Sequence, residues 1–259
     1  MPATATAPRA FTPAATIDEV IARLDAAIDR ARRENSRLGF FACLYRSVTV
    51  RVKEGIAAGR FQDGPRMERL DVIFANRYLA ALEAYQGGRR PTRSWQAAFD
   101  AAAGANLLIL QHLLLGINAH INLDLGIAAA ETSPGADIHA LEHDFDEITK
   151  LLGEMLEDVQ DRISRVSPWM RVLDWIGMRH DEGTFTFALS NSRDLAWNWA
   201  RRFAGLDRNR LPQEIDALDH VVATLARAIH KPHWWLRPIL AAVRLREPKD
   251  VARVLDALS

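Results

Sequence analysis

Hydrophobic residues recur every three or four positions along most of the chain, the period of amphipathic α-helices, and no segment alternates as a strand would. Helix start and stop signals divide this pattern into successive segments. A long apolar helix is expected between residue 103 and about residue 130. The other expected helices cover residues 16–36, 38–58, 65–86, 92–103, 137–166, 168–178, 184–204, 212–228, 232–243 and 248–258. The pattern predicts an all-α protein.

Particular residues set several of these boundaries. Thr16 and Glu19 have the spacing of a capping box, in which each side chain binds a free backbone N–H at the start of a helix. Pro65 suits a first helical turn, where its missing N–H costs nothing. Gly59 and Gly87 follow helical segments and are typical of helix ends.

The connections between the expected helices are short, and the chain has neither an internal repeat nor a Gly/Ser-rich linker. We therefore expect residues 16–259 to form a single domain, a multi-helix bundle around a buried central helix. Residues 1–15, rich in Ala, Pro and Thr, are expected to be a flexible tail.

The expected central helix carries polar residues in an apolar run, QHLLLGINAHINLDL, at residues 111–125. Between Asp100 and Asp124 there is no charged residue, so the run is nominally long enough to cross a membrane. Its His, Asn and Gln side chains would be costly in lipid, which favours burial in protein and predicts no transmembrane segment. Buried without partners they would cost about 1 to 3 kcal/mol each, so they should be hydrogen-bonded or bound to metal.

The composition bears on whether the protein binds nucleic acid and on the compartment in which it works. Lys plus Arg and Asp plus Glu both total 33, and a net charge of zero gives no sign of nucleic-acid binding. The single cysteine, Cys43, cannot form an internal disulfide, which fits a reducing compartment. The N-terminus lacks the apolar core of a secretion signal, and we expect a cytoplasmic protein.

Four residues of the central run, His112, Gly116, His120 and Asp124, are spaced four apart and fall in one row of a helix. Gly116 leaves room between the histidines for water, an ion or a neighbouring helix. An HxxxD pair can hold a cation or form a structural hydrogen bond. Gln111, Asn118 and Asn122 lie on another face and are expected to tie neighbouring helices together.

The next helix adds a second pair in HALEHDFDE, where His143 and Glu147 are four residues apart. A short loop makes the two helices plausible antiparallel neighbours, so both pairs could converge on a metal. The alternative is a solvated helix start, where acidic residues complement the helix dipole.

The run LGxxxHxxxD followed by HxxxE resembles the all-helical zinc-dependent phospholipase C and single-strand nuclease superfamily. The resemblance implies a metal site with zinc, or another divalent transition metal such as iron. The implied ligands are His120, Asp124, His143 and Glu147, with His112 and His139 in reserve. Asp144 or Asp146 would be the catalytic base, and the metal would activate water to hydrolyse a phosphoester. No histidine precedes His112, so one or two ions, or a relic of the site without metal, are expected instead of three ions.

A longer segment, from Tyr45 to Ala128, resembles a bacterial family of uncharacterised proteins with an HxLLGxNAHINxDL signature. This closer resemblance implies no particular activity.

The candidates for contacting a small-molecule or lipid-like substrate are Arg193, in SNSRDLAWNWARRF, and Asn118. Metal-dependent hydrolysis of phosphoesters is the leading hypothesis for function. A non-catalytic binding protein with a buried His/Asn/Asp hydrogen-bond network and an iron-dependent oxidase are the alternatives.

Overall fold

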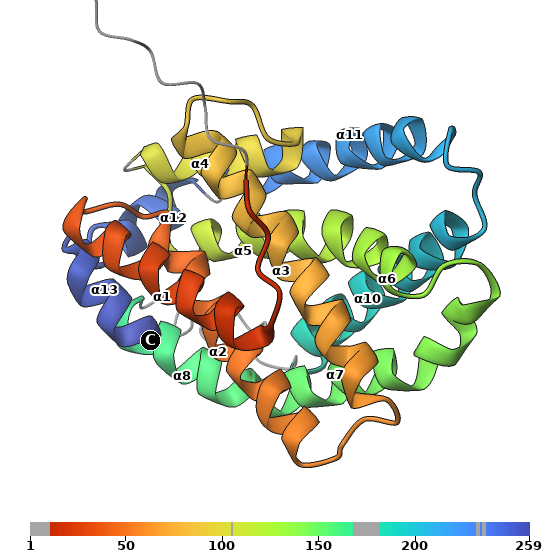
Figure 1. Ribbon diagram of the computed structural model, residues 1–259. Helices are drawn as coiled ribbons and strands as arrows, with labels where there is room; N and C mark the ends of the chain where they lie inside the picture. The colour runs from red at the N-terminus through yellow and green to blue at the C-terminus, as the bar shows by residue number, and fades with distance from the viewer. Residues whose placement is uncertain (1–10, 105, 168–181, 232–233, 235–236) are drawn as a thin grey trace, which may run out of the picture.

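The computed structural model describes residues 11–104, 106–167, 182–231, 234 and 237–259. These residues form helices and their connections, with no strand among them, so the predicted all-α class is confirmed (Figure 1). The α-helices are α1 (Ile17–Arg33), α2 (Gly39–Ala57), α3 (Gly64–Gln86), α4 (Arg93–Ala103), α5 (Ile109–Ala119), α6 (Gly126–Thr132), α7 (Glu142–Glu154), α8 (Leu156–Val166), α10 (Glu182–Ala204), α11 (Leu211–His230), α12 (Arg237–Arg244) and α13 (Val251–Leu258).

Two short helices of other types complete the described elements. The π-helix η1 (His120–Leu125) joins α5 to α6, and the 3-10 helix η2 (Gly135–Leu141) precedes α7. The single helix expected over residues 137–166 is wrong, because α7 ends at Glu154 and α8 begins at Leu156. The two halves pack on different partners, α7 on α2 and α8 on α13. The helix expected over residues 168–178 lies outside the described residues.

Local sequence signals explain several helix ends. The backbone N–H of Glu19 donates to Thr16 Oγ1 over 3.2 Å, which caps α1 as the capping-box spacing predicts. Asp63 caps α3 in the same way, with Pro65 in the first turn. Gly59 adopts a φ of +69° just after α2, a left-handed conformation that glycine takes without strain.

The segment α5, η1 and α6 runs through the middle of the molecule, with other helices on all sides (Figure 1). It packs against α2, α3, α4, α10 and α11. The stretch Ile109–Thr132 has the length and apolar composition of a membrane span, yet 83% of its most apolar window is buried inside the protein. A buried core helix has these same properties, so the described residues contain no clear transmembrane segment.

Glycines permit two close approaches to this central segment. A Cβ at Gly116 would lie 2.5 Å from the Phe41 ring of α2, so a neighbouring helix fills the space expected there. A Cβ at Gly126 would lie 2.8 Å from the Ala196 carbonyl oxygen of α10. Both positions exclude larger residues because the facing atoms belong to tightly packed helices.

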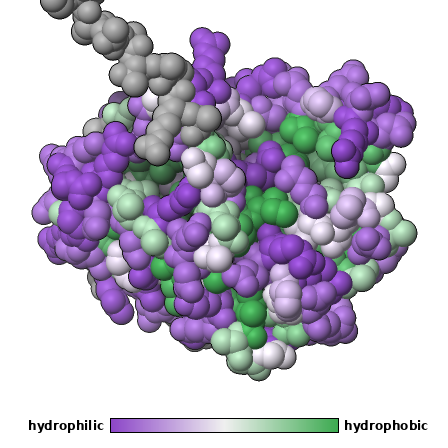
Figure 2. Space-filling view, viewed as in Figure 1, coloured by the Kyte–Doolittle hydropathy of each residue, from purple (hydrophilic) through white to green (hydrophobic). Residues whose placement is uncertain are grey.

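The face of the molecule seen in Figure 2 is mainly hydrophilic, and hydrophobic residues form small, separate patches on it.

Of the tail expected over residues 1–15, only residues 11–15 are described, and they lie against α3. There the Ala14 N–H donates to Asn76 Oδ1 over 2.7 Å, and Asn76 Nδ2 donates to the Ala14 carbonyl over 2.9 Å.

Candidate functional site

Asp124, an expected metal ligand, is buried and bonded to two protein donors. Trp95 Nε1 donates to its Oδ2 over 2.7 Å, and Arg77 Nε donates to its Oδ1 over 2.8 Å. Burial raises the pKa of Asp124, while the Arg77 guanidinium opposes that rise. Asp124 therefore joins η1 to α3 and α4, and both of its oxygens are engaged.

His120, four residues before Asp124, is enclosed by aromatic rings. Its imidazole stacks on Phe74 with ring centres 3.5 Å apart, and the Tyr45 ring lies edge-on at 4.2 Å. Both ring nitrogens are buried and have no hydrogen-bond partner among the described residues. Burial and the nearby Arg77 hold the pKa of His120 well below its usual value, so the ring is neutral at pH 7.

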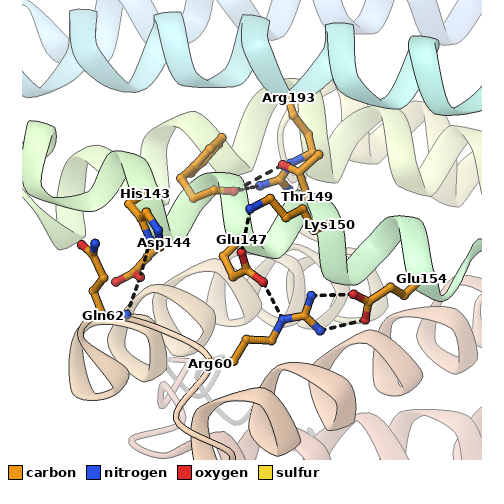
Figure 3. A network of polar contacts seen from close by, with 10 residues as sticks. Arg60, Gln62, His143, Asp144, Glu147, Thr149, Lys150, Glu154 and Arg193 are labelled. Carbon is orange, nitrogen blue, oxygen red and sulfur yellow. Dashed lines mark hydrogen bonds and ion pairs between the residues drawn. The ribbon is translucent and has the colours of Figure 1, made fainter.

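His143, Asp144 and Glu147, on α7, lie in different surroundings (Figure 3). Asp144 is fully buried and accepts hydrogen bonds from the backbone N–H groups of Gln62 and Asp63 and from Arg66 Nη2. Burial raises its pKa, but the Arg66 guanidinium and these N–H groups outweigh burial and hold the value below the usual range. Asp144 therefore anchors the loop between α2 and α3 and is bonded to protein where a catalytic base would need to be free.

The remaining acidic and histidine residues of this stretch lie near the surface. Glu147 accepts from Arg60 Nε over 2.6 Å and from Lys150 Nζ over 3.1 Å (Figure 3). The His143 side chain is 56% exposed, and Asp146 and His139 are also exposed.

The expectation that His120 and Asp124 face His143 and Glu147 is wrong. All six expected metal ligands lie in the described part of the chain, where no group of three or more His, Cys, Asp or Glu side chains is placed to hold a metal ion. The two carboxylates expected as ligands also do not fit a metal site, since Asp124 and Glu147 are bonded to arginines. The π-helix is one physical reason, because its wider turn breaks the row in which residues four apart share a face.

Gln111 and Asn118 tie the central segment to a neighbouring helix as expected, whereas the hydrogen bond that Asn122 donates stays within the central segment. Gln111 Nε2 donates to the Ile229 carbonyl over 2.8 Å, and Asn118 Nδ2 donates to the Val222 carbonyl over 3.0 Å, so both bind α11. Asn122 Nδ2 donates to Asn118 Oδ1 over 2.9 Å. Asn118, a candidate substrate contact, is therefore held in a structural network.

An apolar cavity of about 140 Å³ lies beside His120. Its walls come from α2, α3, the central segment, α7, α8 and α10, and most of its lining is aliphatic or aromatic. Among the described residues that line it, three have acidic or basic side chains: Asp71, His120 and Arg193.

Three polar groups on this lining lack partners. Besides the His120 nitrogens, the Tyr45 hydroxyl and Asp71 Oδ2 are buried without a hydrogen bond to any described residue. Burial raises the pKa of Asp71 to about 8, so its carboxyl is largely protonated at pH 7. Burial likewise raises the pKa of Tyr45 well above 10. All three groups are neutral at pH 7 and keep unused hydrogen-bonding capacity.

Of the described residues that line the cavity, Arg193 is the one that is mainly charged at pH 7. Its side chain donates to Thr149 Oγ1 and, over 2.7 Å, to the Phe145 carbonyl, and it lies over the Phe145 ring at 4.6 Å (Figure 3). Arg193 is 2% exposed and has no carboxylate within 4.0 Å among the described residues. The charges of Asp146 and Asp194 act on Arg193 from farther away. A buried cation without a direct ion pair is costly, and such groups concentrate at functional sites.

The sequence pattern did not single out Tyr45, Phe74 and Asp71. A signal for Asp71 was present, because Met67, Asp71 and Ala75 are spaced four apart on the buried face of α3. An acidic residue in such a row marks either a partnered carboxylate or a functional one. The aromatic residues gave no comparable signal, since they look like ordinary core.

Comparison with known proteins identifies the family to which the chain belongs. The model of a family of unknown function, DUF5995, matches residues 17–232. No curated protein and no solved structure matches the chain. The chain belongs to this family, in agreement with the signature-bearing uncharacterised family that the segment from Tyr45 to Ala128 resembles.

Proposed function

We propose that this member of the DUF5995 family is a binding protein for a small, mostly apolar molecule that carries one acidic group. The observation that supports this proposal is the apolar cavity beside His120, whose lining includes a buried arginine with no carboxylate partner. Among the alternatives drawn from the sequence, this proposal develops the non-catalytic binding protein.

The volume of the cavity limits the size of the ligand. An apolar cavity of about 150 Å³ is large enough for benzene, and the volume here is about 140 Å³. A single aromatic ring or a short branched chain would therefore fill it. Burying such a ligand removes apolar surface from water, at about 25 cal/mol for each Å² buried.

Charge on the lining favours an anion. At pH 7 the pKa values leave His120, Tyr45 and Asp71 neutral, whereas Arg193, with a pKa lowered by burial to about 10, stays charged. A ligand carboxylate near Arg193 would neutralise the buried cation. Protonated Asp71 would not repel it and could donate a hydrogen bond.

Metal-dependent hydrolysis of phosphoesters is not the function that this geometry favours. It would require ligands from the central segment and from α7 around one ion, and Asp124 and Glu147 are instead held by Arg77 and Arg60. The hydrogen bonds of Asp124 to α3 and α4, and those of Asn118 to α11 and Asn122, fit a scaffold that shapes the cavity.

Calorimetric titration with benzoate and toluene tests the proposal, because the two differ by a carboxylate in place of a methyl group. Benzoate is expected to bind at least about tenfold more tightly at pH 7, since a hydrogen bond to a charged group contributes about 1.5–3 kcal/mol. Arg193→Gln should abolish this preference and leave toluene binding intact.

Arg60→Gln is the matched control, because Arg60 lies nearby, pairs with Glu147 and Glu154, and does not line the cavity. It should bind both ligands as the parent does. Equal affinity for benzoate and toluene in the parent, or no saturable binding of either, would refute the proposal.

A further inference from the structure

A second cavity, of about 280 Å³, lies near the other end of the central helix. It is formed by the segment before α2, the start of α5 and the connection between α12 and α13. Its lining differs from that of the apolar cavity because four of its ten described residues are charged: Arg37, Arg244, Glu247 and Lys249. Three of these four carry positive charge.

The cations of this cavity are not paired directly with a carboxylate of a described residue, although the charges of Arg244 and Glu247 act on each other. Within the described ranges, Arg37, Arg244 and Lys249 form no ion pair at 4.0 Å or less. Arg244 Nη1 donates to the Asn106 carbonyl over 3.0 Å, a neutral partner. The cavity therefore holds an excess of positive charge, which attracts anions.

Glu247 offsets only part of this excess, because it carries at most one negative charge against the three positive ones. Its carboxylate accepts from the Ser167 hydroxyl and, over 3.1 Å, from the backbone N–H of Ile109. It is 8% exposed, and burial raises its pKa. Its bonded position holds the start of α5 against the segment before α13.

His112 is the polar group that points to a ligand. It is 6% exposed, lines the cavity, and has no hydrogen-bond partner for either ring nitrogen among the described residues. The Phe40 ring packs edge-on against it at 5.9 Å and fixes its orientation. Burial and the neighbouring Arg37 lower its pKa to about 4, so at pH 7 it offers one donor and one acceptor.

We propose that this second cavity binds a small phosphorylated polyol or sugar. Arginine forks match the oxygens of a phosphate, and lysine adds a point charge, so Arg37, Arg244 and Lys249 would hold the phosphate. His112 would bond a hydroxyl group of the same molecule. The volume exceeds that of a phosphate alone and accommodates a five- or six-carbon unit. This inference is independent of the binding proposed at the His120 cavity.

The binding would also affect the C-terminal helix. Arg244, Glu247, Lys249 and Val251 line the cavity, and all lie beyond residue 232, where the family match ends. Helix α13 packs on α1, α2 and α8. A ligand that joins Arg37 to Lys249 would stabilise this packing, because it binds only when both segments are in place.

Calorimetric titration with ribose 5-phosphate, inorganic phosphate and ribose tests the site. We expect saturable binding of ribose 5-phosphate, at least tenfold tighter than that of phosphate and with no binding of ribose. Arg37→Gln and Lys249→Gln should each weaken it at least about tenfold, since each removes a charge-assisted hydrogen bond. Hydrogen exchange in residues 251–258 should slow on binding.

Arg246→Gln is the matched control, because Arg246 is exposed, lies three residues from Lys249 and does not line the cavity. It should leave the affinity unchanged. An equal loss in Arg246→Gln would mean nonspecific attraction and would overturn the site. Equal affinity for phosphate and ribose 5-phosphate would overturn the polyol ligand, and absence of saturable binding at millimolar concentration would overturn both.

Discussion

Asp124→Ala is expected to lower the free energy of unfolding by about 3–5 kcal/mol, the usual cost of removing one partner from a buried ion pair. The carboxylate accepts from Trp95 and Arg77 and is 1% exposed. Alanine would leave the buried indole N–H without its partner and, among the described residues, the Arg77 guanidinium with Glu131 as its remaining ion pair, 3.6 Å away. Urea unfolding followed by circular dichroism measures the loss.

Glu131→Gln is the control for this experiment, because it removes the outer, 45% exposed partner of the same arginine. It should cost less than about 1 kcal/mol, as exposed ion pairs do. A loss in Asp124→Ala no larger than that of the control would contradict the structural role assigned to Asp124.

Asp71→Asn is expected to stabilise the protein by about 3–5 kcal/mol at pH 8 and to have little effect near pH 4. The pKa of Asp71 is raised by burial from 3.8 to about 8 in the folded state. Between these values the unfolded chain releases a proton that the folded chain retains, which costs the fold about 1.4 kcal/mol per pH unit. The stability present below pH 4 is therefore lost as the pH rises towards 8, and asparagine avoids this loss.

Unfolding of Asp71→Asn and the parent at a series of pH values measures this difference. Asp146→Asn, a change at an exposed residue of α7, should leave the pH profile unchanged. A stability difference that is constant between pH 4 and pH 8 would contradict a protonated Asp71. Weaker binding of benzoate by the stabilised variant would show that the Asp71 carboxyl contributes to binding. The protein would then keep this residue for its function at a cost in stability, a common compromise.

Helix positions were predictable because the signals that set them are local. Thr16 reaches the N–H three residues away, and the apolar period of a helix needs no knowledge of its neighbours. The break at Met155 was missed because it depends on two packing partners, α2 and α13, that lie far away in the sequence.

The candidate site was predictable only in part, since its partners are distant in sequence. The row from His112 to Asp124 correctly marked buried polar residues, and Arg193 does line a cavity. Their partners could not be inferred from spacing, because Arg77 lies 47 residues from Asp124 and Arg60 lies 87 residues from Glu147. Two HxxxD-like pairs on successive helices therefore looked like a metal site, although arginines bind both carboxylates.

Methyl NMR tests the central claim most directly, the claim that the cavity beside His120 binds a small apolar acid. With isoleucine methyl groups labelled, benzoate should shift Ile117, Ile121 and Ile148, which line the cavity. The signals of Ile17 and Ile28, buried on α1 away from it, should stay in place. Shifts confined to isoleucines outside the cavity lining, or no shifts at saturating benzoate, would contradict the claim.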